Sequence, residues 1–144
     1  MSVAIALGSA PPAQAHPRPA PSATAASPSA QTVLTEAGRH AGKPYRWGAT
    51  GPSAFDCSGF VGYVFARAGK SLPRVSRDQR AAVPRIPASQ ALPGDLLFTH
   101  NSAGVVYHVA IYAGDGYMWD APRTGSVVSK RKIWSSNITY GRVR

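Results

Sequence analysis

Residues 53–69 read SAFDCSGFVGYVFARAG, and this stretch decides the fold expected for the rest of the chain. From about Asp56 to Ala68 the apolar side chains recur at helical spacing on one face, and Gly69 is suited to a helix C-terminus. Either Ser53 or Asp56 has the side chain of an N-cap residue. We therefore expect an amphipathic helix that begins close to Cys57 and packs on the rest of the domain.

The residues before this helix divide into parts by composition. Residues 1–15 hold a short apolar run and an A-x-A sequence at 13–15 typical of a signal-peptidase site, although no positively charged segment precedes the run. We interpret them as a signal-peptide remnant. Residues 16–30 are mainly Pro, Ala and Ser with almost no large apolar side chains, so we expect a disordered linker. The folded domain is expected to span 31–144 and to open with a short helix over 32–40.

Beyond residue 83 the sequence changes from helical to strand spacing. Turn residues stand at 93–95 and 114–116, and the second turn is typical of a hairpin. Helices followed by antiparallel strands indicate the α+β class, with N-terminal helices packed on a small antiparallel β-sheet. The pattern between the turns predicts short strands over 95–99, 107–112, 117–120 and 126–133.

The chain is strongly basic, because 16 Lys and Arg stand against 6 Asp and Glu and give a formal net charge of +10. Such a charge favours a polyanionic partner such as nucleic acid, anionic lipid or an anionic wall polymer. The cations are spread out, however, with the tightest run at Lys130–Lys132, and no nucleic-acid-binding motif accompanies them. We therefore expect a solvated basic surface and no nucleic-acid partner. No stretch approaches the roughly 20 apolar residues that cross a membrane, so we expect no membrane span.

Cys57 is the only cysteine, so it cannot form a disulfide within the chain. A lone thiol is either an apolar filler of the core or a chemical reagent. Cys57 falls in the first turn of the expected helix, where unpaired N–H groups and the positive end of the helix dipole favour the thiolate. Its neighbours Asp56 and Ser58 are polar, whereas a filler would be expected among Val61 and Val64. We infer that Cys57 is a nucleophile.

A cysteine nucleophile needs a base, and His108 is better placed than His40 or His100. In the strand over 107–112, His108 is expected on the face opposite the apolar residues, so that it emerges from a packed strand. If the next strand pairs with this one, Asp120 lies beside His108 and can orient the imidazole by accepting its Nδ1–H. The weakest alternative is a metal site, which lacks paired-ligand spacing and would use Cys57, His100, His108 and Asp120.

With these residues in place, the sequence resembles the NlpC-type bacterial cell-wall cysteine peptidases. The resemblance implies a papain-like α+β fold in which the cysteine opens a helix packed on a small antiparallel sheet. The motifs follow the order of that family over nearly all of 31–144, at residues 45–52 (YRWGATGP), 55–60 (FDCSGF), 72–79 (LPRVSRDQ), 93–96 (PGDL), 108–112 (HVAIY) and 118–122 (MWDAP).

The resemblance implies roles for individual residues. Cys57 is the nucleophile and His108 the base. Asp120 stands at the third catalytic position, which is most often histidine in the family, and a carboxylate there still accepts the imidazole N–H. The remaining implied positions are a tyrosine near the oxyanion and two residues that hold the stem peptide in some members, which correspond here to Tyr45, Asp56 and Ser58.

The resemblance also implies a function. We expect a monomeric, secreted or cell-wall-associated hydrolase of peptidoglycan stem peptides, commonly cutting between D-glutamate and a diamino acid, with no metal and no organic cofactor. Its basic surface is expected to contact anionic wall polymers. Two other interpretations stay open: an amidase that cuts the sugar–peptide linkage, and a catalytically inactive or regulatory wall-binding module. The departure from histidine at Asp120 motivates the second of these.

Overall fold

The structure is a computed structural model and describes residues 27–144. The expected signal-peptide remnant and the linker up to residue 26 lie outside the described residues. The first helix, α1 (Ala30–Arg39), begins two residues before the predicted start at Thr32. The reason is Ser29, whose side-chain oxygen accepts the Thr32 N–H at 3.0 Å and caps the helix. Helix α1 therefore begins at the end of the stretch 16–30 that the sequence predicts to be a linker.

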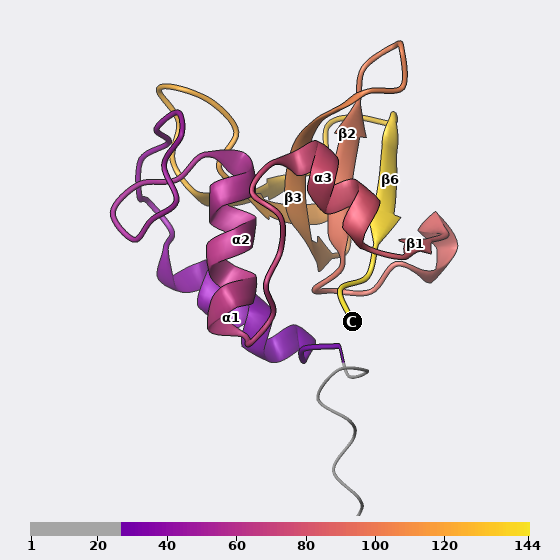
Figure 1. Cartoon of the computed structure of the whole chain (residues 1–144), viewed down its shortest axis with the longest axis horizontal. Coiled ribbons are helices and arrows are strands. Elements are labelled where there is room, and N and C mark those ends of the chain that lie inside the picture. The colour runs from indigo at the N-terminus through magenta and orange to yellow at the C-terminus, as the bar shows by residue number, and fades with distance from the viewer. Residues whose placement is uncertain (1–26) are drawn as a thin grey trace, which may run out of the picture.

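Three helices precede a six-stranded antiparallel sheet of order β1-β6-β2-β3-β4-β5, which confirms the α+β class. Figure 1 shows α2 in front of α1, both beside the sheet, while α3 lies across β2 and β3. Both α2 and α3 pack on β3. The remaining bounds are α2 (Cys57–Arg67), α3 (Ser76–Ala82), β1 (Arg85–Ile86), a 3-10 turn (Ala88–Gln90), β2 (Leu96–His100), β3 (Val106–Gly114), β4 (Tyr117–Asp120), β5 (Ser129–Lys132) and β6 (Ile138–Gly141).

Helix α2 forms where the sequence predicts it, and its ends explain its length. Asp56 is the N-cap, because its carboxylate accepts the Gly59 N–H at 2.7 Å. Gly69 takes the left-handed conformation with φ of 86°. The N–H of Lys70 then donates to the Phe65 carbonyl at 2.8 Å, which satisfies a carbonyl that the helix end leaves open. The cap is thus Asp56 rather than Ser53.

The core lies mainly between α2 and the sheet. Phe60, Val61 and Val64 of α2 are fully buried against the side of β3 that carries Val109 and Ile111. Burial of each such side chain contributes about 1.5–3 kcal/mol. On the other side of the sheet lies a smaller apolar cluster of Leu97, Ala110, Met118 and Tyr140. Because side chains alternate along a strand, β3 serves both clusters and is held firmly from two sides.

One helix, two strands and a 3-10 turn were not predicted: α3, β1, β6 and Ala88–Gln90. Strand β6 pairs with β2 and β1 and lies inside the sheet. The strand predicted over 126–133 is shorter in the structure, because only Ser129–Lys132 (β5) pairs with β4. Residues 121–128 instead run beside the loop after α1, as Figure 1 shows. There the N–H of Tyr45 donates to the Ser126 carbonyl at 2.9 Å. Within residues 27–144 no helix combines the length and hydropathy that a membrane span requires.

Candidate functional site

Cys57 is the first residue of α2, and its side chain is half-buried. The loop before the helix lies tightly against this end, since the Asp56 N–H donates to the Ala49 carbonyl at 2.9 Å. Gly59 makes the approach feasible, because a Cβ on Gly59 would overlap the Ala49 carbonyl oxygen. The thiol is therefore held in the first turn of a capped helix, where N–H groups and the helix dipole favour negative charge.

His108 lies between Cys57 and Asp120. Its Nε2–H donates to Oδ2 of Asp120 at 2.8 Å, and its ring lines the same groove as Cys57. Strand pairing explains the contact: Ile111 lies opposite Trp119, so His108 and Asp120 fall on the same side of the sheet. The expected neighbourhood of these two side chains is confirmed.

Two details of the predicted geometry are wrong. Asp120 accepts from Nε2 rather than from Nδ1, which leaves Nδ1 as the ring nitrogen on the side of Cys57. His108 also does not emerge from the sheet, because only 5% of it is exposed. Helix α2 packs on β3, and Pro122 lines the same groove as His108, so little of the imidazole reaches solvent.

The charges around His108 favour its protonated form. Burial lowers the pKa of His108, but hydrogen bonds to Asp120 and Cys57 and their negative charges outweigh burial and raise it to about 9. Asp120 is fully buried, and burial raises its pKa. Hydrogen bonds from His108 and Arg131 more than offset this and hold the pKa of Asp120 below its usual value. The imidazolium of His108 and the carboxylate of Asp120 are therefore both favoured at neutral pH.

Arg131 is part of this site, which the sequence analysis missed by treating Lys130–Lys132 as solvated. Its Nε–H donates to Oδ1 of Asp120 at 2.8 Å and its Nη2–H to Oδ2 at 2.7 Å. In β5 the side chains of Lys130 and Lys132 are exposed while Arg131 turns inward. Two signals in the sequence could have identified Arg131. Side chains alternate between the two faces of a strand, so Arg131 points away from the face of Lys130 and Lys132. A buried carboxylate such as that of Asp120 also needs a cation beside it.

A second cluster surrounds the helix cap. Both oxygens of Asp56 accept from the Arg74 guanidinium, at 3.1 and 2.6 Å, and Arg74 also donates to Oγ of Ser58 at 2.9 Å. The hydrogen bond to Asp56 raises the pKa of Arg74 above its usual value. Asp56 and Ser58, two of the predicted site residues, therefore lie together in the structure. Arg74 joins them, although the sequence analysis expected it only as a surface cation. Arg74 lies 18 residues after Asp56 in the sequence, and the ion pair with Asp56 holds its guanidinium beside the start of α2.

Tyr45 lies in the groove of about 380 Å³ that Cys57 and His108 also line. Burial raises the pKa of Tyr45, and the negative charges of Cys57 and Asp56 raise it further. Its hydroxyl therefore stays protonated at neutral pH and is available as a hydrogen-bond donor.

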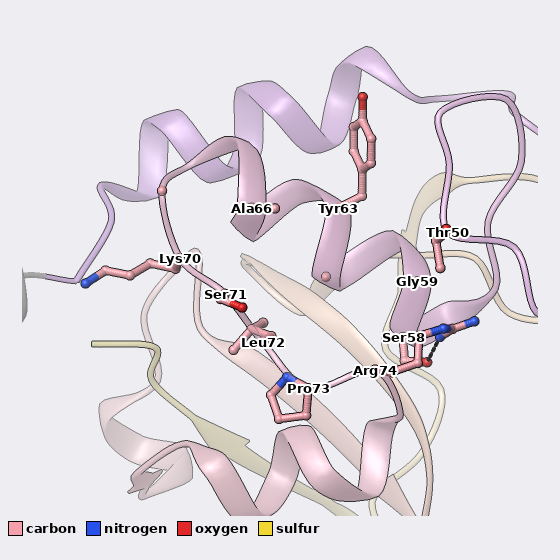
Figure 2. Close-up of a pocket in the computed structure, with 12 residues that line it drawn as sticks. Thr50, Ser58, Gly59, Tyr63, Ala66, Lys70, Ser71, Leu72, Pro73 and Arg74 are labelled. Atoms are coloured by element: carbon pink, nitrogen blue, oxygen red, sulfur yellow. Dashed lines mark hydrogen bonds between the residues drawn. The ribbon is translucent and has the colours of Figure 1, made fainter.

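A larger hollow of about 610 Å³ runs along α2. Figure 2 shows Ser58, Gly59 and Arg74 at one end of it and Lys70 near the other. It is lined neither by Cys57 nor by His108, so the larger cavity is not the one that holds the nucleophile and base.

The other two base candidates lie elsewhere. His40 is bonded to Glu36 at 2.9 Å and to Lys43 at 2.8 Å. His100, the last residue of β2 rather than a loop residue, is bonded to Gly104 and Thr139. Among residues 27–144, no three His, Cys, Asp or Glu side chains are grouped so that they could hold a metal ion.

Comparison with known proteins finds one family that matches most of the chain. The sequence profile of the NlpC/P60 family matches residues 42–142. The probable endopeptidase p60 of Listeria monocytogenes is 52% identical over 93 residues, which cover 65% of this chain and 19% of that protein. The bifunctional muramidase/DL-endopeptidase CwlT of Bacillus subtilis is 37% identical over 121 residues, which cover 79% of this chain and 36% of that protein.

A solved structure has the same fold. The crystal structure of the NlpC/p60 domain of the peptidoglycan hydrolase SagA superposes with a TM-score of 0.72 at 35% identity, covering 81% of this chain and 99% of that one. By contrast, the chain spans only about a fifth of p60 and about a third of CwlT. The similarity is therefore to one domain of these larger proteins.

Proposed function

This chain belongs to the NlpC/P60 family, and we propose that residues 31–144 form a cysteine peptidase domain that cleaves peptidoglycan stem peptides. The observation that carries the proposal is the position of His108, which lines the same groove as Cys57 and is hydrogen-bonded through Nε2 to the buried Asp120. This arrangement supports a nucleophile and a base that share one groove, with a buried group behind the base that orients it.

The proposed reaction begins with Cys57 as thiolate and His108 as imidazolium. The Sγ atom attacks the scissile carbonyl carbon, while the backbone N–H of Cys57 and the Tyr45 hydroxyl stabilise the developing oxyanion. The Nδ1–H of His108 then protonates the leaving amine, which departs and leaves a thioester on Cys57. A water molecule, deprotonated by His108, hydrolyses that thioester and restores the thiolate. Asp120 keeps the ring oriented throughout and stabilises the imidazolium.

We further propose that the bond cut joins D-glutamate to a diamino acid such as diaminopimelate. In support, a relative of this chain is named as a DL-endopeptidase. Asp56 and Ser58 border the nucleophile and both accept hydrogen bonds from Arg74, which supports a role for them in holding the stem peptide beside Cys57. Action outside the cell and contact of the basic surface with anionic wall polymers belong to the same proposal; the formal charge of +10 supports the latter.

The test is digestion of a defined muropeptide, with the products identified by mass spectrometry. The proposal predicts a fragment whose new N-terminus is the diamino acid. A released peptide that begins at the first stem residue would instead identify an amidase. Binding to sacculi without any product would favour a wall-binding module.

A further inference from the structure

Besides Tyr45, three large aromatic side chains line the groove that contains Cys57 and His108, and all three are exposed. Trp47 is 86% exposed, Trp134 55% and Tyr107 51%. Single exposed apolar side chains are normal, but several gathered around one site indicate a surface that binds something. Rings of Trp and Tyr suit such a role because they combine a wide apolar face with a polar tip. We call Trp47, Tyr107 and Trp134 the aromatic rim.

Trp47 is held by backbone hydrogen bonds on both sides. The N–H of Arg46 donates to the Phe55 carbonyl at 3.0 Å. The N–H of Gly48 donates to the carboxylate of Asp56 at 3.2 Å. The exposed ring of Trp47 therefore projects from a backbone that is fixed to the start of α2, and binding a ligand there requires little ordering of the chain.

Tyr107 is the extra residue of a β-bulge. Val106 lies opposite His100 and His108 lies opposite Thr99, so Tyr107 has no partner across the β2–β3 ladder. Bulges redirect a side chain, and this one leaves Tyr107 exposed immediately before the buried His108. Trp134 follows β5 at a similarly fixed point, because the N–H of the preceding Ile133 donates to the Gly116 carbonyl at 2.9 Å.

The proposed substrate has two parts, the stem peptide and the glycan strand, and the aromatic rim suits only one of them. Stem peptides are rich in alanine, acidic and diamino residues, which offer small or charged groups and no wide apolar face. The sugar rings of the glycan strand have broad C–H faces that stack on aromatic rings, and hydroxyl and amide groups that bond to polar side chains. Arg123 lines the same groove and can donate to those oxygens.

We propose that the aromatic rim binds the sugar rings of the glycan strand that carries the stem peptide. The inference rests on the proposed function and extends it, because it makes peptides still attached to glycan the preferred substrate over free peptides. The sugars bind at the rim of the groove while the peptide reaches Cys57 within it.

The first test measures binding without turnover. Peptide-free glycan strands are titrated into the Cys57→Ala chain by calorimetry, and then into the same chain carrying Trp47→Ala or Trp134→Ala. We expect binding that weakens at least about fivefold in each tryptophan variant, a loss typical of one stacked ring. The matched control is Tyr117→Ala, which removes an exposed ring (38%) from β4, outside the groove, and should bind as before. Absence of glycan binding, or equal binding in all variants, overturns the proposal.

The second test compares kcat/KM on one stem peptide, either free or attached to its disaccharide. The wild-type chain should favour the attached form, and the two tryptophan variants should reduce that ratio. A ratio unchanged by the variants contradicts the inference even if overall activity falls. Glycan binding without peptide cleavage would count against the proposed function alone, whereas peptide cleavage without glycan binding would count against the aromatic rim alone.

Discussion

His108 and His40 have nearly the same surroundings but different second partners. Each is 5% exposed. Each lies within hydrogen-bond distance of a buried carboxylate through Nε2, at 2.8 Å from Asp120 and 2.9 Å from Glu36. Both carboxylates also bond to arginine, and hydrogen bonds to histidine and arginine hold the pKa of each below its usual value although burial raises it. Neither burial nor a carboxylate partner therefore separates a catalytic histidine from a structural one.

The other ring nitrogen makes the difference. Nδ1 of His40 lies 2.8 Å from Nζ of Lys43. The rings of Phe55 and Tyr63 pack edge-on against the imidazole ring of His40. Both nitrogens of His40 are thus occupied by permanent partners. The second partner of His108 is Cys57, in a groove open to substrate. A histidine that is fixed at one nitrogen and free to exchange a proton at the other is suited to catalysis.

The largest expected effect comes from His108→Gln. Removal of the base should lower kcat/KM on a defined muropeptide by about 10³-fold, within the range for loss of general acid–base catalysis. His100→Gln is the matched control, because the ring of His100 is hydrogen-bonded to Gly104 and Thr139, away from Cys57, and this variant should retain activity. A His108→Gln chain that folds and keeps wild-type kcat/KM contradicts the assignment.

His40→Ala should affect stability instead of catalysis. It removes one partner of the buried Glu36 and leaves space between Phe55 and Tyr63, so unfolding should become easier by about 2–4 kcal/mol. Urea denaturation followed by circular dichroism measures this change. Activity per folded molecule should stay at the wild-type level. A loss of turnover without a loss of stability would mean that His40, like His108, takes part in catalysis.

Asp120→Asn should lower kcat/KM by roughly 100-fold, because the ring of His108 loses a charged acceptor of its Nε2–H. The hydrogen bond and charge of Asp120 help raise the pKa of His108 to about 9. Without them that pKa falls, so the alkaline limb of the pH profile of kcat/KM should move to lower pH. An alkaline limb that does not move would mean that Asp120 is not coupled to His108 during turnover.

Arg131→Met should have the smallest effect on catalysis among the three variants of the His108 site, a several-fold loss in kcat/KM, because Arg131 is hydrogen-bonded to Asp120 and not to His108. Its hydrogen bonds help to keep the pKa of Asp120 low despite burial. That pKa rises when the cation is removed, so the acidic limb of the profile should move to higher pH. Arg131→Lys should restore the charge without the two-point geometry and recover part of the activity. Equal profiles for all three chains would exclude a positioning role.

Much of this arrangement follows from local sequence. The amphipathic pattern and Gly69 predict α2, and the position of Cys57 at its start follows from the cap. Strand alternation and the turn at 114–116 bring Asp120 close to His108, because the two strands of a hairpin pair in a definite register.

What the sequence could not provide depends on contacts between distant residues. The nitrogen that faces Asp120 is set by how the His108 ring packs, which alternation alone does not determine. Arg131 and Arg74 become site residues only once β5 and the segment before α3 are placed against their carboxylates. Strand β6 is short and is stabilised by pairing on both sides, with β1 and β2, rather than by its own composition.

In the proposed reaction Cys57 forms the bond to substrate, and digestion of one defined muropeptide by wild type and by Cys57→Ala is the most direct test of this role. Release of the stem-peptide fragment is followed by mass spectrometry, with circular dichroism to show that both chains are folded. We expect release by the wild type and none above the buffer blank by Cys57→Ala. Release by Cys57→Ala at the wild-type rate would contradict this role.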